Sequence, residues 1–394
     1  PRTSMRRRTA IALSALTLAA LAPAPAAPAA EVRDGDRTTL PGMPERLPPG
    51  QECTTQQGRR TAAAPWTRGA LGLDQVWRLS RGRGVTVAVV GTGVSDDPAV
   101  LAGRVKALGA AGQDCVGRGT FQAGLVAGAS LPGQGFSGVA PEARILAVRG
   151  TGQRGEPDPA RLADGVREAA EAGADVITVT APLDGSDQRV RAAMAAARRA
   201  DALVIVPAAA DSVPSGQEKA KPAPAAPKEA LAVLDTGPQG VRPEQAPPYT
   251  RADLTAPGGA LVGPGPVGDG KWTASGSSLA AAVTAGTAAL VRSYHPTLHA
   301  DQVRQRLLAG AYPGNIPALD PYGAVSTVVP DRTFTITTGT KPVRLAKDPD
   351  TAGARDTAYL ITAAATGTIL LVGLLAVILP RGRARGWRPG RYDG

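Results

Sequence analysis

The chain has 394 residues and a formal charge of +11, with 44 Lys and Arg against 33 Asp and Glu. Hydrophobic residues make up 43% and there are two Cys, which excludes a wholly disordered chain, a collagen and a disulfide-dense mini-protein. Most of the charge lies at the ends: residues 1–8 carry +4 and residues 381–394 carry +4, which leaves +3 for the rest. We expect no nucleic-acid partner, because no basic stripe with interleaved aromatic residues occurs.

The N-terminal segment has the pattern of a secretory signal peptide. Met5 and the three following arginines precede an uncharged apolar run over residues 9–21, and small residues over 22–30 offer cleavage sites. We therefore expect residues 1–30 to be a signal peptide. A short anchor helix is the alternative.

The C-terminal segment has the pattern of a membrane anchor. Residues 358–379 carry no charge, which is enough chain to cross a hydrocarbon core of about 30 Å. We expect a transmembrane helix over 358–380 that Pro380 ends, with a buried core helix as the alternative. Five arginines follow, so the positive-inside rule predicts a cytoplasmic basic tail over 381–394 and an extracellular large domain, held at the cell membrane by a single span.

Between these ends, short β-branched or apolar runs alternate with helical patterns. Strands are predicted over 85–90, 144–148, 176–179, 202–206 and 230–233, and helices over 121–129, 159–172, 186–200 and 276–293. This alternation predicts an α/β fold with a parallel sheet and helices on both faces. The remaining segments are predicted to be an N-terminal extension (31–65), the main domain (66–330) and a polar stalk (331–357).

The two cysteines of an exported chain suggest one disulfide, Cys53–Cys115. Closing this loop is worth about 4 kcal/mol on the loop-entropy model. Two free thiols are the alternative. The sequence has no His-x-x-x-His or Cys-x-x-Cys motif and no carboxylate cluster, so neither a metal site nor a cofactor is indicated.

Four sequence blocks carry a family resemblance. They are the strand and glycine turn at 87–94, the segment 115–124, Gly-Val-Ala-Pro-Glu-Ala at 138–143 and Ser-Gly-Ser-Ser-Leu-Ala-Ala at 275–281. In this order they resemble the Asp motif, the His motif, a downstream turn and the Ser motif of subtilisin-like serine peptidases (subtilases). The resemblance covers about residues 66–325 and implies a subtilisin-like three-layer fold with a mostly parallel central sheet.

Within that family the chain resembles the mycosins, the membrane-anchored subtilases of type VII secretion systems. The shared features are the signal peptide, a Cys just before the His motif, a Cys in the N-terminal extension, and a single C-terminal span with a basic tail. This resemblance implies type VII secretion membrane components as partners.

The resemblance also implies that the catalytic groups are degenerate. The nucleophile position is Ser278, but the Asp position is Gly91 and the His position is Arg118, and arginine stays protonated and cannot act as a general base. Asp211 stands at the oxyanion Asn position, where a carboxylate would repel the developing charge. We expect Arg118 to fill the cleft or to pair with an acid such as Asp211, and Pro182 to remove a backbone donor from the substrate edge.

Other bases are poor candidates. His295 and His299 follow Ser278 and are expected to be solvated loop residues, and Lys271 is expected to be an exposed loop residue. The resemblance therefore implies an inactive, membrane-anchored serine peptidase homologue with a structural role at a type VII secretion system. The alternatives are an active serine endopeptidase that processes secreted proteins, and a peptide-binding module that uses the residual cleft.

Overall fold

The computed structural model describes residues 39–213, 221–328, 352–384 and 386. The expected signal peptide lies outside these residues, as do most of the expected stalk and tail. The chain divides into two compact units, Pro1–Val329 and Pro330–Gly394. Each unit is described by itself.

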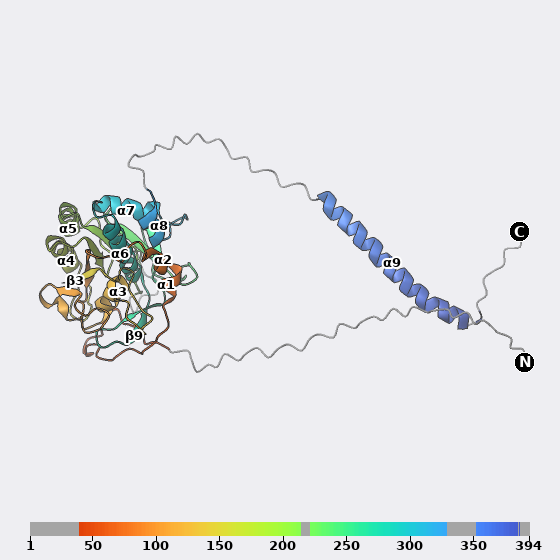
Figure 1. Ribbon diagram of the computed structural model, residues 1–394, viewed down its shortest axis with the longest axis horizontal. Coiled ribbons are helices and arrows are strands. Elements are labelled where there is room, and N and C mark those ends of the chain that lie inside the picture. The colour runs from red at the N-terminus through yellow and green to blue at the C-terminus, as the bar shows by residue number, and fades with distance from the viewer. Residues whose placement is uncertain (1–38, 214–220, 329–351, 385, 387–394) are drawn as a thin grey trace, which may run out of the picture. The chain divides into compact units, whose positions relative to one another are not determined.

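A seven-stranded sheet organises the first unit (Figure 1). The strand order is β2-β3-β1-β4-β5-β6-β7, and every neighbouring pair is parallel. The strands are β1 Thr86–Gly91, β2 Val105–Ala107, β3 Arg144–Arg149, β4 Val176–Val179, β5 Leu203–Pro207, β6 Leu231–Thr236 and β7 Leu254–Pro257. The five predicted strands are confirmed. The edge strands β2 and β7 escaped prediction because they are short and lack a continuous apolar run.

Helices cover both faces of this sheet, as predicted. Alternate strand residues form one core with α3 (Arg118–Ala127) and α6 (Ser277–Tyr294), and the other set forms a second core with α4 (Pro159–Glu171) and α5 (Gln188–Arg199). The first unit thus has three layers, helices–sheet–helices, and its β-branched strands are buried on both faces. The shorter helices are α1 Trp66–Ala70, α2 Leu73–Val76, η2 Gly109–Gly112, α7 Ala300–Ala309 and α8 Pro321–Ser326.

Aspartate N-caps mark the starts of α4 and α5. The Asp158 carboxylate accepts from the Arg161 N–H at 3.0 Å, and the Asp187 carboxylate accepts from the Arg189 N–H at 2.6 Å. Such caps satisfy backbone donors that a helix start leaves unpaired. The predicted helix over 159–172 is thereby confirmed to within one residue.

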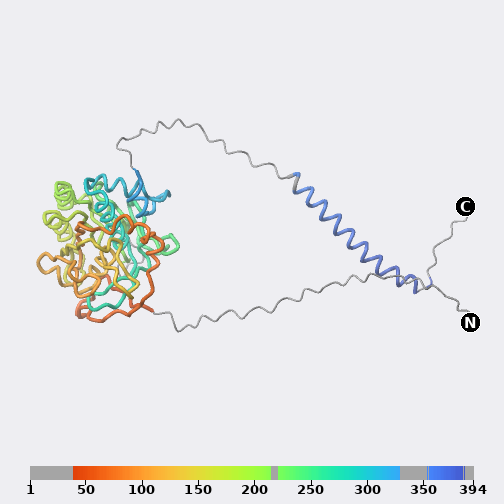
Figure 2. Tube along the Cα trace, viewed as in Figure 1, coloured from red at the N-terminus to blue at the C-terminus, as the bar shows by residue number. Residues whose placement is uncertain are grey.

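The N-terminal extension lies against a two-stranded antiparallel hairpin. The hairpin consists of β8 (Leu261–Pro264) and β9 (Lys271–Ala274). Gly42 pairs with Thr273 and Arg59 pairs with Lys271 through single bridges. Figure 2 shows the start of the described chain, in red, running beside this later segment. The extension is therefore part of the folded domain and is not a free arm.

The second unit contains the helix α9 (Ala352–Ala384). Its segment Arg355–Ala384 is long and apolar enough to cross a membrane. The prediction that Pro380 ends the helix is wrong, because α9 continues past it to Ala384. Proline removes only one backbone N–H bond from a long helix, so the helix can continue. Elsewhere in α9, the Thr362 and Thr366 hydroxyls donate to the carbonyls four residues earlier at 2.8 Å, which satisfies these polar groups within the helix.

Candidate functional site

The resemblance-derived site residues meet at one edge of the sheet. Gly91 ends β1, Thr180 follows β4 and Asp211 follows β5, so the carboxyl ends of neighbouring parallel strands bring them together. Arg118 is the first residue of α3 and Ser278 is the second of α6. This edge is where an α/β fold of this type binds ligands.

A buried ion pair occupies the centre of the site. The Arg118 Nη2 lies 2.6 Å from the Asp211 Oδ2 and donates to the Ser275 carbonyl at 2.9 Å. The two side chains are only 4% and 7% exposed. The expected pairing of Arg118 with Asp211 is confirmed. Because such a pair excludes water, removal of one partner leaves the other charge buried and uncompensated.

Asp211 also caps α6. Its Oδ1 accepts from the backbone N–H of Ser278 at 2.8 Å, and its Oδ2 accepts from the Ser278 hydroxyl. A Cβ on Gly276 would lie 2.2 Å from the Asp211 Cγ, and the φ of Gly276 is 143°, so only glycine fits there. Ser278 is completely buried. The carboxylate thus holds a helix N-terminus and a hydroxyl in a structural arrangement.

At Gly91, which the resemblance assigns to the Asp position, the space for a side chain is filled. A Cβ added to Gly91 would lie 2.2 Å from the Thr180 Cγ2. Any side chain at this position therefore requires Thr180 to move or to lose its methyl group. The sequence signal for this was Thr180 itself, because residues 180–182 resemble the family's Ser-Leu-Gly substrate-edge segment and Thr has one methyl more than Ser.

The N-terminal extension narrows the remaining cleft. A cavity of about 190 Å³ is lined by Glu45 and Arg46 from the extension together with Arg118, Pro182 and Asp211. The Ser212 hydroxyl donates to the Glu45 carboxylate at 2.7 Å. Burial, and then the charge on Asp211, raises the pKa of Glu45. The extension is thus one wall of the site.

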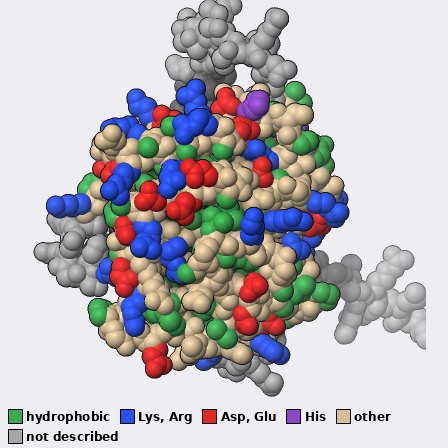
Figure 3. Space-filling model, turned by 90° about the vertical axis from the view of Figure 1, so that its left-hand side faces the viewer, with side chains coloured by type: hydrophobic (Ala, Val, Ile, Leu, Met, Phe, Trp, Pro, Cys, Tyr) green, Lys and Arg blue, Asp and Glu red, His purple; other side chains and the backbone are tan. Residues whose placement is uncertain are grey.

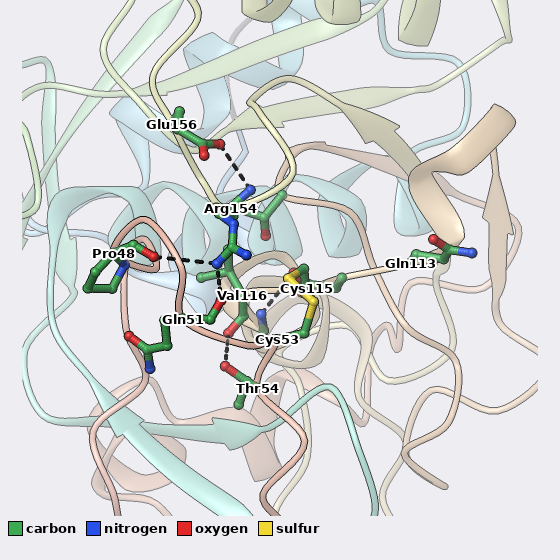
Figure 4. Close-up of a disulfide and its surroundings, with 12 residues drawn as sticks. Pro48, Gln51, Cys53, Thr54, Gln113, Cys115, Val116, Arg154 and Glu156 are labelled. Atoms are coloured by element: carbon green, nitrogen blue, oxygen red, sulfur yellow. Dashed lines mark hydrogen bonds between the residues drawn. A yellow bond between two sulfur atoms is a disulfide. The ribbon is translucent and has the colours of Figure 1, made fainter.

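The Cys53–Cys115 disulfide is confirmed, and it anchors the extension beside the start of α3 (Figure 4). The Thr54 hydroxyl donates to the Val116 carbonyl at 2.9 Å, and Arg154 donates to the Pro48 carbonyl at 3.4 Å. Since Cys115 precedes Arg118 by three residues, this covalent anchor lies next to the ion pair in sequence.

Asp114 is a buried polar residue that sequence reasoning missed. Its carboxylate accepts from the Gly117 N–H at 2.8 Å and from both the N–H and the hydroxyl of Thr120 at 2.7 Å. Burial raises the pKa of Asp114. The carboxylate orders the turn that leads into α3 and thereby helps to place Arg118.

The two histidines lie at the far end of α6 from Ser278. The helix has 18 residues, so the rise of about 1.5 Å per residue places its ends about 25 Å apart. The expectation of solvated loop residues is wrong for His295, which is half-buried and has its Nε2 2.8 Å from the Val325 carbonyl. His299 is exposed and stands at the N-cap of α7. Neither imidazole serves Ser278.

Lys271 is not the exposed loop residue that we expected. It begins β9, is 2% exposed, and its Nζ donates to the Gln134 Oε1 at 3.1 Å. The extension covers it, because Arg59 pairs with its backbone. Burial lowers the pKa of Lys271. This amine is desolvated, but the hydroxyl of Ser278 bonds to Asp211, so the two residues form no Ser–Lys dyad.

Within the described ranges, no group of three or more His, Cys, Asp or Glu side chains could hold a metal ion.

Comparisons with known proteins agree on the family. The subtilase family model (Peptidase_S8) matches residues 82–335. Mycosin-4 of Mycobacterium tuberculosis (strain ATCC 25618 / H37Rv) is 32% identical, over 86% of this chain and 86% of its own length. The chain belongs to the subtilase family, and within it to the mycosins. Mycosin-3 of the same organism is also 32% identical, over 80% of this chain and 83% of its own length.

Solved mycosin structures share the fold. The MycP3 protease from the type VII (ESX-3) secretion system has a TM-score of 0.60 at 28% identity, covering 74% of this chain and 95% of that one. MycP1 with its N-terminal propeptide removed gives 0.59 at 27% identity, covering 68% of this chain and 99% of that one. The predicted subtilisin-like fold is thus confirmed. The motif resemblance assigns Gly91, Arg118 and Asp211 to the positions of the family's Asp, His and Asn.

Proposed function

We propose that this mycosin is a catalytically inactive, membrane-anchored subtilase with a structural role in a type VII secretion assembly. The assembly is suggested by its relatives, since the similar MycP3 belongs to the type VII (ESX-3) secretion system. The mycosin family supplies the context. The loss of activity is argued from this chain's own residues.

The observation that carries the proposal is the Arg118–Asp211 ion pair beside Ser278. A serine hydroxyl becomes a nucleophile when an imidazole takes its proton, and guanidinium has no free lone pair for this task. The group that accepts from the Ser278 hydroxyl is a carboxylate bound to Arg118, and carboxylates in general are far weaker bases than imidazole. It also stands at the position where the family donates to the oxyanion, and a carboxylate there opposes the developing charge.

The substrate side of the site supports the same proposal. The remaining cavity of about 190 Å³ is smaller than the 300–1,000 Å³ or so of ordinary ligand pockets. Pro182, on the segment that would pair with an extended peptide, has no N–H to donate. A peptide-binding role for the residual cleft is therefore disfavoured.

Anchoring is proposed from α9. Its length and composition suit one span, and the arginines that follow favour a cytoplasmic C-terminus with the subtilase domain outside the membrane. In this arrangement the domain stands on the outer side of the secretion membrane, next to the components that it would hold.

The activity claim is tested with the full-length protein in detergent. A fluorophosphonate probe and a casein substrate are applied to the wild-type chain and to a Ser278→Ala variant, with an active subtilase as positive control. We expect no labelling and no cleavage above Ser278→Ala. Stoichiometric labelling at Ser278 would support the alternative, an active serine endopeptidase that processes secreted proteins.

The structural claim is tested in a strain that lacks the native gene. Ser278→Ala should restore type VII secretion as well as the wild-type chain does, whereas a chain without residues 352–394 should not. Affinity purification followed by mass spectrometry should recover type VII membrane components with both full-length forms. If Ser278→Ala abolishes secretion while protein levels are equal, the role is not purely structural.

A further inference from the structure

The exposed surface of α5 is rich in positive charge. The helix has four arginines and no acidic residue between Gln188 and Arg199, and all four are exposed. In the described part of the chain, none of them joins an ion pair. On the neighbouring α4, by contrast, Arg167 pairs with Glu171 at 3.0 Å. Figure 3 views this side of the domain, where Lys and Arg side chains form several groups with Asp and Glu between them.

A hollow of about 470 Å³ lies among these arginines. Met194 and Ala195 are its apolar residues, and its charged residues are Arg191, Arg198, Arg199 and Glu229. We refer to it as the α5 hollow. A second cavity, also about 470 Å³, shares Met194, Arg198 and Glu229 and extends to the start of β5. The α5 hollow has a formal charge of +2, from three arginines and Glu229, whereas the second cavity adds Asp201 and Asp301 against Arg304.

The α5 hollow is separate from the Ser278 site. The second cavity reaches Leu203, where β5 begins, whereas Asp211 follows the opposite end of that strand. A ligand in the α5 hollow would therefore not touch the Arg118–Asp211 pair. Binding in the α5 hollow would therefore involve residues of α5 and none of the residues around Ser278.

We propose that the α5 hollow is a docking site for an acidic segment of a partner protein, which carries several carboxylates around one apolar side chain. Exposed guanidinium groups bind carboxylates in a bidentate geometry, and the exposed Ala195 offers an apolar contact beside them. Glu229 repels part of such a segment and so limits where its carboxylates lie. A flat anionic membrane fits this concave, partly acidic surface less well than a protruding side chain does.

The test uses the full chain in nanodiscs of phosphatidylcholine. The probes are a short fluorescent peptide of Glu residues around one central Leu, its Gln counterpart, and vesicles of phosphatidylcholine and phosphatidylglycerol in equal parts. We expect the Glu peptide to bind more tightly than the Gln peptide, and its binding to weaken as salt is added. Replacement of the central Leu by Gly should also weaken binding.

Matched variants assign the binding to α5. The combined Arg191→Glu, Arg198→Glu and Arg199→Glu variant should lower affinity about tenfold, since three exposed ion pairs are lost. The milder Gln version of the same triple variant keeps the helix propensity and should show a smaller loss. Glu229→Gln should raise affinity. The control variant replaces Arg78, Lys106 and Arg144 together by Glu. These three residues are exposed and, among the described residues, form no ion pair.

Three outcomes would overturn the proposal: equal binding of the Glu and Gln peptides, an equal loss in the control variant, or binding to the anionic vesicles without binding to the peptide. The catalytic proposal is independent of all three, because fluorophosphonate labelling at Ser278 reports on the other end of β5.

Discussion

Two buried aspartates contact the start of α3, and their negative charges are compensated in different ways. Asp211 is balanced by a full positive charge, since Arg118 bonds to it directly. Asp114 accepts from neutral donors, which include the N–H groups of Gly117 and Thr120 and the Thr120 hydroxyl. The first aspartate forms an ion pair at the proposed inactive site, whereas the second caps a turn and a helix start.

Under the proposed function, this difference explains how a peptidase scaffold keeps its shape without its chemistry. The carboxylate of Asp211 still organises the N-terminus of α6, and Gly276 still gives it room. The charge of Arg118 compensates a residue that would otherwise be buried alone. The proposed inactivity therefore accounts for Arg118 and Asp211 together, as a structural ion pair at the positions where the resembled motifs have His and Asn.

The largest expected effect is a gain of activity, and it requires four substitutions. Gly91→Asp, Arg118→His, Asp211→Asn and Thr180→Ser together should give peptide-ester hydrolysis at least about a hundredfold above Ser278→Ala, a small part of what a complete triad supplies. The same set without Thr180→Ser should remain inactive, because the side chain introduced at position 91 would collide with the Thr180 methyl. Burst kinetics with a chromogenic ester measure the activity of the four-substitution and the three-substitution variants.

Equal activity of the three-substitution and four-substitution variants would contradict the steric role of Thr180. If both fold and neither hydrolyses the ester, the Pro182 edge and the Glu45 wall are the next constraints to remove.

A second prediction concerns the ion pair. Arg118→Met leaves the buried Asp211 charge alone and should lower the free energy of unfolding by about 3–5 kcal/mol. The double variant Arg118→Met with Asp211→Asn should recover most of this loss, because no buried charge then lacks a partner. Urea unfolding of the detergent-solubilised protein measures the difference. A double variant as unstable as Arg118→Met would show that packing of the guanidinium, and not its charge, carries the effect.

Much of this site was accessible from sequence because it depends on ordered motifs. The strand-end positions of Gly91 and Asp211 and the helix starts at Arg118 and Ser278 follow from the parallel-sheet pattern. The chemistry of the side chains then predicted the pairing of Arg118 with Asp211. Contacts between segments far apart in the chain were not accessible. Nothing local in the sequence shows that Arg59 covers Lys271, which was wrongly expected to be exposed, or that the Thr180 methyl occupies the space beside Gly91.

A third prediction concerns the Cys53–Cys115 disulfide and distinguishes blockage of the site by the extension from loss of the catalytic groups. Replacement of Cys53 and Cys115 by Ser should lower the free energy of unfolding by about 2–4 kcal/mol, because the pair closes a loop of 62 residues. The extension should then become accessible to protease near Glu45. Hydrolytic activity should stay absent, since Arg118 remains in place. Activity in this variant would mean that the extension, and not the missing triad, blocks catalysis. Limited proteolysis and the ester assay on one preparation decide the matter.

The smallest expected effect is a pH dependence that arises from Asp114. Burial raises the pKa of its carboxyl above the value in the unfolded chain, so the folded protein takes up a proton that the unfolded chain does not as the pH falls. The stability of the wild-type chain relative to Asp114→Asn should therefore increase as the pH falls through the folded pKa, and should level off below about 3.9, where the unfolded carboxyl is also protonated. The control is Asp164→Asn, the same substitution at an exposed position. Unfolding curves at a series of pH values measure both differences. A relative stability of Asp114→Asn that improves towards acid pH would mean that the three hydrogen bonds to the ionised carboxylate outweigh its burial, and that Asp114 resembles the charge-balanced Asp211 after all.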